Sequence, residues 1–481
     1  MYRIVCGLTA LTMIYAGIVA APAAAAADED AGFQRQVYVT NRGITWAGEL
    51  GPHVVVRFAI GAAGEVVQLG EPVAAGNGSR GIVFTPDARA AYVVAQDDHV
   101  IYPYRVNDDG ALTDLAAPVD SGGVAPFSIA ITPGGRTLYV ANLGSGTVSV
   151  FGLDGSRVPV MLGEPVVTGS PNPRSVAVSP DGRSLFVAHG VPADDRDDVL
   201  VVYPIRADGT LGPARATVPI GATGMGLAIT PDGKFLYVAC ALAQTVYGFR
   251  IGPNGELTAV PHSPWPAATT PEGLAITPDG SRLFVTSVGT QPEVSPDDDG
   301  LWTFDIGDDG DLTLVGRRSS AATGPGVATT PDGQHLFVSN FFANTVSAFE
   351  VDTLGELAGS PTPSLGFAPS FNSVALPPNQ GPSASFTVDS DGELATFDAT
   401  ESADRDGRIA RYDWEFGDGT TLPDGGPRPS HVYGHPGAFR VKLVVTDNEG
   451  CSTALIYTGR TAMCTGSVAG RATQLVRFAA G

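Results

Sequence analysis

The sequence predicts an all-β protein: a seven-bladed β-propeller followed by an immunoglobulin-like β-sandwich. Prolines of one turn type recur at near-constant spacing, with steps of 47, 47, 51, 47, 53 and 47 residues; they are Pro86, Pro133, Pro180, Pro231, Pro278, Pro331 and Pro378. A strand like LYVAN follows the turn, and it occurs seven times between Val37 and Asn340. A period in the forties with several strands per repeat is typical of propeller blades.

The repeat is clearest at Met225–Asn254, which reads as three strands with tight turns. Alternation of apolar and small residues indicates half-buried strands. Between the first two strands, Thr230-Pro231-Asp232-Gly233 is a turn, because Pro presets φ, Asp bonds to nearby backbone and Gly accepts a left-handed angle. A single sheet of this kind would expose both of its faces to solvent, so it must stack against its copies.

The two repeated strands are offset at the chain ends. Val37–Asn41 has no turn before it, and Asn372–Leu376 has no LYVAN-type strand after it. We therefore expect the C-terminal strand to become the inner strand of the blade that the N-terminus begins. Such a shared blade closes the ring and removes two open sheet edges.

The expected division of the chain is a secretory signal at 1–27, an acidic leader at 28–35, the propeller at 36–379, a linker at 380–382 and the sandwich at 383–478. The signal is inferred from Arg3, the apolar run Ile4–Ala20 and the alanines before Asp28. No second apolar stretch of about 20 residues is present, so no membrane span is expected. We expect a secreted protein, free in the exterior or associated with the cell surface.

The chain of 481 residues has 28 Lys and Arg against 50 Asp and Glu, a net charge of −22. That charge repels phosphate backbones and anionic lipid, so binding to nucleic acid or to a membrane surface is not expected. It suits a soluble secreted protein, which we expect to be a monomer without a cofactor or a bound metal.

Two faces of the disc differ in their loops. The proline turns are short and alike, so their face is expected to be structural, whereas the opposite face carries long loops at Asn41–His53, His189–Val199 and Ser287–Gly300. Two of these loops contain acidic runs, Asp194–Asp198 and Asp297–Asp299. Their spacing does not match a calcium loop, so we favour solvated loops over a Ca²⁺ site.

The residue six before each turn proline should line the channel rim on the loop-rich face. These residues are Arg80, Phe127, Arg174, Met225, Glu272, Pro325 and Asn372. Two arginines, a carboxylate and an amide suit an anionic or polyhydroxylated ligand. The alternative is that Arg80 and Arg174 pair with Glu272 or with carbonyls and only plug the channel.

The four cysteines are few. Cys6 lies in the signal, and Cys451 and Cys464 are close enough in sequence to form a disulfide in an oxidising compartment. Cys240 takes a place that Asn holds in other repeats, and we interpret it as a buried, inert thiol.

The LYVAN and SVAVSPDG phrases resemble the YVTN-type propeller repeats, including the lactonase family with the bacterial 6-phosphogluconolactonases. The resemblance covers most of 36–379. Members of that family carry a His-Pro-His-Ser run where this chain has Asn172-Pro173-Arg174-Ser175, whereas Arg42 lies in a matching Asn-Arg-Gly phrase. A general base for lactone opening must be a His or a carboxylate near the mouth. His189 and Glu272 are the candidates.

Residues 383–478 look like a PKD domain, chiefly on the phrase Trp414-Glu415-Phe416-Gly417-Asp418-Gly419 and on VKLVVTDN at Val441–Asn448. We expect Trp414 and Phe416 in the core, Asp413 and Asp418 on turn amides, and a Cys451–Cys464 bridge across the last strands. The resemblance implies protein or carbohydrate contacts, or a spacer role, outside the cell.

These observations favour a secreted binding protein that uses the loop-rich face of the propeller for an extracellular protein or carbohydrate. Its candidate ligand-binding residues are Arg42, Arg80, Arg174, Glu272 and Asn372. The alternative is a lactonase-like hydrolase that acts at the channel mouth through His189 or Glu272. A carboxylate beside a cavity bounded by two arginines would favour hydrolysis, and a mouth filled by Phe127 and Met225 would favour binding.

Overall fold

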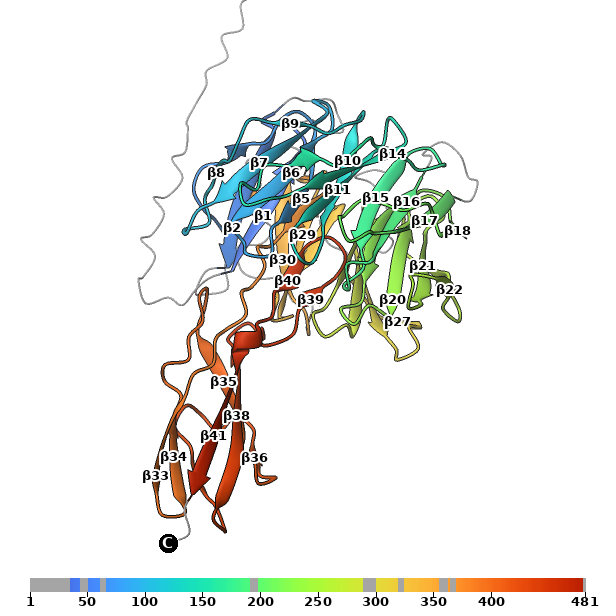
Figure 1. The fold of residues 1–481 in the computed structure, drawn as a ribbon. Helices are drawn as coiled ribbons and strands as arrows, with labels where there is room; N and C mark the ends of the chain where they lie inside the picture. The colour runs from blue at the N-terminus through green and yellow to red at the C-terminus, as the bar shows by residue number, and fades with distance from the viewer. Residues whose placement is uncertain are drawn as a thin grey trace, which may run out of the picture. The chain divides into compact units, whose positions relative to one another are not determined.

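The computed structural model describes residues 35–43, 51–60, 66–190, 198–288, 300–318, 324–353, 362–363 and 369–478. Within these ranges, seven sheets of the predicted kind are present, each ordered from a first strand to an outer strand (Figure 1). The predicted seven-bladed propeller is confirmed. All its strand pairs are antiparallel, as expected for consecutive strands joined by short turns.

The strands have the following bounds. The first strands are β5 (Ser79–Phe84), β10 (Pro126–Ile131), β15 (Pro173–Val178), β19 (Gly224–Ile229), β24 (Pro271–Ile276), β28 (Gly326–Thr329) and β32 (Pro369–Ala375). The second strands are β1 (Gln36–Asn41), β6 (Ala90–Ala95), β11 (Thr137–Asn142), β16 (Ser184–His189), β20 (Phe235–Cys240), β25 (Arg282–Ser287) and β29 (His335–Asn340). The third strands are β2 (Val54–Ile60), β7 (Val100–Val106), β12 (Thr147–Gly152), β17 (Asp198–Pro204), β21 (Thr245–Ile251), β26 (Leu301–Ile306) and β30 (Thr345–Glu350).

The outer strands are shorter in most blades. They are β3 (Val66–Gln68), β8 (Leu112–Asp114), β13 (Val160–Met161), β18 (Ala216–Ile220), β22 (Leu257–Ala259), β27 (Leu312–Arg318) and β31 (Thr362–Pro363). Four further two-residue strands pair with a third strand: β4 (Val73–Ala74), β9 (Val119–Asp120), β14 (Val166–Val167) and β23 (Trp265–Pro266).

The ring is closed as predicted. The strand β32 pairs with β1, with Val39 opposite Val374 and Tyr38 opposite Ala375, so one blade combines the two ends of the propeller segment. Each first strand contacts the first strand of the next blade, and β32 contacts β5. The first strands therefore line the central channel, and the apolar faces of neighbouring sheets bury each other.

The proline turns contain a side-chain hydroxyl bridge in addition to the predicted Pro-Asp-Gly sequence. The Thr230 hydroxyl donates to Asp232 Oδ1 (2.6 Å) and accepts the backbone N–H of Phe235 (3.0 Å). The same hydroxyl bonds recur at Thr85, Ser179, Thr277 and Thr330. Gly233 has φ +73°, which a side chain would strain. The repeated hydroxyl therefore fixes the start of the second strand in these five blades.

Cys240 is buried at the end of β20, as predicted. At the equivalent place, Asn340 donates to Thr345 Oγ1 (2.8 Å). In the Cys240 blade the matching hydroxyl, Thr245 Oγ1, is buried and has no hydrogen-bond partner among the described residues. The blade that contains Cys240 therefore lacks the side-chain hydrogen bond that Asn340 makes to Thr345 in the equivalent blade.

The C-terminal sandwich consists of two sheets. One holds β33 (Thr387–Asp391), β34 (Leu394–Asp398) and β37 (Ser430–Val432), and the other β36 (Thr421–Leu422), β35 (Ile409–Glu415), β38 (Gly437–Asp447) and β41 (Arg471–Phe478), preceded by the 3₁₀ turn η1 (Val468–Gly470). As predicted, Trp414 and Phe416 are in the core, and Asp413 and Asp418 accept the backbone N–H groups of Asp424 and Thr420.

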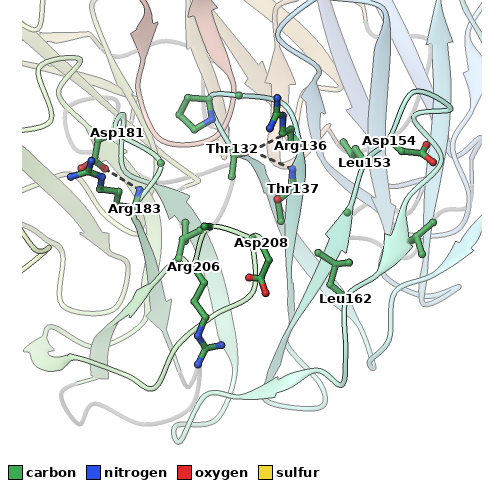
Figure 2. Close-up of a pocket in the computed structure, with 18 of the residues that line it drawn as sticks. Thr132, Arg136, Thr137, Leu153, Asp154, Leu162, Asp181, Arg183, Arg206 and Asp208 are labelled. Carbon is green, nitrogen blue, oxygen red and sulfur yellow. Dashed lines mark hydrogen bonds between the residues drawn. The ribbon is translucent and has the colours of Figure 1, made fainter.

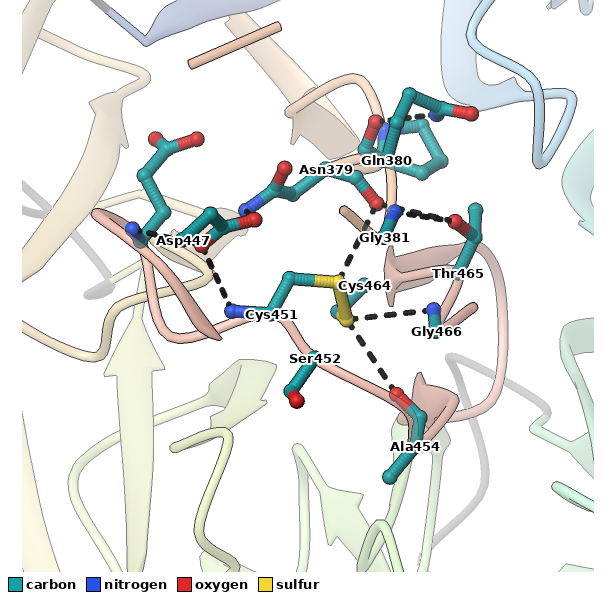
Figure 3. Close-up of a disulfide and its surroundings, with 12 residues drawn as sticks. Asn379, Gln380, Gly381, Asp447, Cys451, Ser452, Ala454, Cys464, Thr465 and Gly466 are labelled. Atoms are coloured by element: carbon teal, nitrogen blue, oxygen red, sulfur yellow. Dashed lines mark hydrogen bonds between the residues drawn. A yellow bond between two sulfur atoms is a disulfide. The ribbon is translucent and has the colours of Figure 1, made fainter. Parts of the chain in front are cut away.

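Cys451 and Cys464 form a disulfide, which confirms the expected pairing, but the bridge does not hold the last strands of the sandwich. Both cysteines belong to an excursion between β38 and β41, and Figure 3 shows the bridge beside Asn379, the last residue of the predicted propeller segment. This excursion carries a two-stranded hairpin, β39 (Ile456–Tyr457) and β40 (Ala462–Cys464). We call residues 456–464 the channel hairpin.

The channel hairpin leaves the sandwich and packs on the propeller (Figure 1). Propeller and sandwich belong to one compact unit, Phe33–Gly481. Tyr457 and Ala462 are buried in a core cluster with Ile-, Leu- and Val-rich strands of the propeller. A second contact across the junction is the ion pair of Arg35 with Glu449, in which both side chains are less than a tenth exposed.

Candidate functional site

The rim residues occupy one repeated position. Arg80, Phe127, Arg174, Met225 and Glu272 are each the second residue of a first strand. In all five strands the pairing register shifts at that residue, which marks a β-bulge. A bulge frees a residue from the ladder and re-aims its side chain. The same irregularity therefore presents five different side chains at the channel.

Two arginines enclose one aromatic ring at the mouth. The Arg80 guanidinium lies 4.3 Å from the centroid of the Phe127 ring, and the Arg174 guanidinium lies 5.4 Å from it. Both distances are within the range of cation–π attraction. Phe127 also packs on Phe371 (5.2 Å between centroids) and on Met225 in a small buried cluster. Phe127 and Met225 thus fill part of the mouth.

Among the described residues, neither Arg80 nor Arg174 is bonded to a carboxylate. Arg80 donates to Gln96 Oε1 (2.5 Å) and to Ser370 Oγ (3.0 Å). Arg174 donates to the Gly190 carbonyl (2.8 Å) and approaches Met225 Sδ (3.5 Å). Arg174 thus bonds to a backbone carbonyl, as the plug alternative expects of such a residue, but among the described residues no bond joins either arginine to Glu272.

The electrostatics of the mouth are unusual. Burial raises the pKa of Glu272 to about 7, and the charges of Arg174 and Arg80 oppose that rise only in part. Burial also lowers the pKa of Arg80 to about 9, helped by the neighbouring charges of Arg42 and Arg174. Arg42 itself has a buried Nε without a hydrogen-bond partner among the described residues. Two guanidinium groups, those of Arg80 and Arg174, therefore act on one carboxyl group that is half protonated near neutral pH, and Arg42 adds a third positive charge beside Arg80.

Asn372 and Pro325 hold the remaining rim positions. Asn372 has φ +55° and donates through Nδ2 to Ser128 Oγ (3.4 Å), so its amide joins the last blade to β10. Pro325 is buried just before β28. Both residues shape the wall of the channel, and neither adds a charge to it.

His189 is not brought to the mouth with the arginines. Its ring is fully buried, and Nδ1 lies 3.3 Å from the Val199 carbonyl of β17. Burial lowers its pKa to about 4, and Nε2 has no partner among the described residues. The imidazole is thus neutral at physiological pH and enclosed behind the first strand.

The acidic loops expected on this face lie outside the described residues, except for Asp198. Asp198 Oδ2 accepts the Thr223 backbone N–H (2.7 Å), which fixes the start of β19. No helix among the described residues is long and apolar enough to span a membrane.

The opposite, turn-bearing face holds a groove of about 880 Å³ (Figure 2). Two carboxylates that line it accept hydrogen bonds from backbone groups of the surrounding turns. Asp181 accepts the Arg183 backbone N–H (3.0 Å), and Asp208 accepts the Thr210 backbone N–H (2.9 Å). Figure 2 also shows exposed guanidinium groups of Arg136 and Arg183 around this groove. The groove arises where neighbouring turns meet, in keeping with the structural role expected for this face.

The channel hairpin is the feature that sequence reasoning missed. It closes the channel from the turn-bearing face and inserts Arg460, whose Nη1 donates to the Asn372 carbonyl (3.4 Å). A signal was present in the 23 residues between Asp447 and Arg471, a long excursion for a sandwich whose other connections are short.

Comparison with known proteins agrees with the fold. The family model described as "Lactonase, 7-bladed beta-propeller" matches residues 37–225 and 101–362, and the PKD domain model matches 379–461. The periplasmic gluconolactonase PpgL of Pseudomonas aeruginosa is similar in structure (TM-score 0.56, 24% identity, 71% of this chain and 99% of that one). A candidate 6-phosphogluconolactonase of Bacteroides uniformis is similar too (TM-score 0.58, 21% identity, 71% and 99%). At these identities the likeness shows the fold alone.

Curated relatives match a shorter part. A microbial collagenase of Vibrio alginolyticus is 37% identical over 83 residues, 17% of this chain and 10% of the collagenase. Collagenase ColA of Clostridium perfringens is 47% identical over 58 residues, 12% of this chain and 5% of ColA. The chain thus spans a tenth or less of these relatives. The propeller match covers more than half of the chain, so this protein belongs to the lactonase family of seven-bladed β-propellers and carries a PKD domain.

Proposed function

We propose that this chain is an exported binding protein that takes an acidic carbohydrate at the channel mouth of its propeller. The observation that carries the proposal is that the guanidinium groups of Arg80 and Arg174 lie near Glu272 and, among the described residues, make no bond to it, with the charge of Arg42 beside Arg80. Cations that are partly or wholly removed from water without a bonded counter-charge favour an anionic ligand, because a bound anion offsets the cost of their desolvation.

The net charge of the whole chain also bears on which anions the mouth would bind. The net charge is −22, and yet the mouth concentrates cations. An acidic surface repels anions in general, so a local positive site selects those that fit it.

Export is part of the same proposal. The disulfide Cys451–Cys464 supports it, since such bonds persist in oxidising compartments. The apolar run near the start of the sequence is the other support.

Titration calorimetry of the full chain tests the binding proposal. We expect sodium D-galacturonate or D-gluconate to bind and D-galactose to bind far more weakly. In Arg174→Gln, the dissociation constant for the acid should rise about tenfold or more, since a charge-assisted bond is worth about 1.5–3 kcal/mol. Arg136→Gln, on the turn-bearing face, is the matched control. Equal affinity for acid and neutral sugar would refute the proposal.

A second candidate function is lactone hydrolysis, which the pKa of about 7 at Glu272 favours. In that reaction, the Glu272 carboxylate accepts a proton from water as the water oxygen bonds to the lactone carbonyl carbon. The arginines then stabilise the oxyanion. Its collapse breaks the ring C–O bond, and the leaving ring oxygen takes the proton from Glu272, which gives the hydroxy acid and restores the carboxylate. The names of the propeller relatives suggest gluconolactone and its 6-phosphate as substrates. A positioned general base contributes about 10²–10⁴-fold, so Glu272→Gln must lower kcat by that factor; no turnover above background removes this candidate.

A further inference from the structure

The tip of the channel hairpin binds four blades in succession. The backbone N–H groups of Ile229, Val178 and Ile131 donate to the carbonyls of Thr458 (3.1 Å), Gly459 (2.7 Å) and Arg460 (3.0 Å). Each donor is the residue two before its turn proline. The Thr461 hydroxyl donates to the Phe84 carbonyl of the next blade (3.1 Å). Consecutive tip residues therefore satisfy equivalent backbone groups around the channel wall.

This placement points the Arg460 side chain into the channel. Its guanidinium donates to the Asn372 carbonyl (3.4 Å) and lines an apolar cavity of about 60 Å³, bounded by Ile82, Leu274, Val327 and Val374. Such a volume holds more than one water-sized group. No carboxylate forms an ion pair with Arg460 within the described part of the chain, and burial lowers its pKa to about 10. Arg460 keeps some exposure to solvent, but a guanidinium group in largely apolar surroundings without a counter-charge is still costly.

Arg460 and Arg80 meet the same strand. Arg80 donates to Ser370 Oγ, and Arg460 donates to the carbonyl of Asn372, two residues further along β32. Two residues of a strand span about 7 Å. The two guanidinium groups thus approach one short stretch of the channel wall, Arg80 from the open mouth and Arg460 from the closed end.

We propose that Arg460 is the inner anchor of the anion site, so that the PKD domain supplies, through the channel hairpin, a guanidinium for the acidic group of the ligand. This inference rests on the proposed function and adds to it the closed end of the site. The group recognised is a single small anion, either a carboxylate or a sulfate ester. Propeller and PKD domain then act as one binding unit, and the second domain is more than a spacer.

The test uses the full chain and two probes, sodium D-gluconate for a carboxylate and sodium sulfate for a tetrahedral anion, in titration calorimetry at constant ionic strength. Arg460→Met keeps the length of the side chain and removes its charge. We expect it to weaken binding of at least one probe about tenfold, and the probe affected identifies the anion. Arg471→Met removes the same charge from an exposed position of the same domain and should leave both affinities unchanged.

A second readout is the thermal midpoint. Without anion, Arg460→Met should melt higher than the wild-type chain, because a buried unpaired charge has been removed. The saturable stabilisation that the probe gives the wild-type chain should be lost. Arg460→Lys keeps the charge without the planar fork, so it should fold and bind several-fold more weakly, which decides the question if Arg460→Met does not fold.

The outcomes separate this inference from the proposed function. If Arg174→Gln loses binding while Arg460→Met and Arg460→Lys keep wild-type affinity, the inference is overturned and the proposed function stands. If neither probe binds the wild-type chain, both are overturned.

Discussion

The phenol of Tyr457 donates a hydrogen bond to the carbonyl of Ile131, and so joins residues 326 positions apart in the sequence. Tyr457 is fully buried, and its hydroxyl also reaches the Gly459 carbonyl (3.0 Å). A buried polar pair of this kind fixes the geometry around it, since any other arrangement leaves its groups unsatisfied. The bond therefore holds the tip of the channel hairpin in register with the blades.

Replacing Tyr457 with Phe should loosen the hairpin. We expect the free energy of unfolding to fall by about 1–2 kcal/mol, because buried carbonyls lose a donor. Amide hydrogen exchange should become faster at Ile131, Val178 and Ile229, whose N–H groups bond to the hairpin. Tyr433→Phe, which breaks a bond to the Phe416 carbonyl inside the sandwich, is the control and should leave these three amides protected.

The Cys451–Cys464 disulfide should stabilise the hairpin against opening. The two cysteines are 13 residues apart, and a loop of that size is worth about 3 kcal/mol in the chain-entropy description. A Cys451→Ala/Cys464→Ala variant should therefore be cleaved faster within residues 452–463 in limited proteolysis. Unchanged cleavage rates would mean that packing on the propeller alone holds the hairpin.

Anion binding at the mouth should weaken as the pH rises from 6 to 8. The pKa of Glu272 is about 7, so its carboxyl group is mostly neutral at pH 6 and mostly a carboxylate at pH 8. A carboxylate beside the anion costs on the order of 1.4 kcal/mol, so the dissociation constant should rise roughly tenfold. In Glu272→Gln this pH dependence should vanish, and if it persists another group is responsible.

The same shift has a consequence for stability. The pKa of Glu272 is raised on folding from 4.5 to about 7, so the folded state binds the proton more tightly than the unfolded chain. Its contribution is fully present below pH 4.5 and is lost as the pH rises through 7. The Glu272→Gln variant should thus show a smaller loss of unfolding free energy between pH 5 and 8 than the wild-type chain in denaturant titrations.

The Thr245 and Thr345 hydroxyls should respond in opposite ways to the same change. Thr345 Oγ1 accepts a bond from Asn340, so Thr345→Val should destabilise the protein by about 1 kcal/mol. Thr245 Oγ1 is buried without a partner among the described residues, so Thr245→Val should be neutral or stabilising. Equal losses in the two variants, measured by denaturation, would contradict this account of the Cys240 substitution.

The local patterns were sufficient for most of the fold. The turn prolines, the alternating strands and the offset between Val37–Asn41 and Asn372–Leu376 predicted the closed ring, because each depends on residues within one repeat or on a simple count. The rim set from Arg80 to Asn372 was also readable, since the repeat places equivalent residues at one height of the channel. The disposition of His189 was not, because a ring at the end of a strand can face the channel or the next strand, and packing against Val199 decides.

By itself, then, the sequence determined a ring of seven alike sheets and a sandwich after it. Those features follow from periodicity and turn chemistry, which act over a few residues. Only the tertiary structure showed that the disulfide closes the segment between β38 and β41. It also showed that Tyr457 and Arg460, which lie outside the propeller repeats, contact the propeller. The physical reason is that the backbone carbonyls of Ile131 and Asn372, to which these side chains donate, belong to different blades and come together only when the ring has closed.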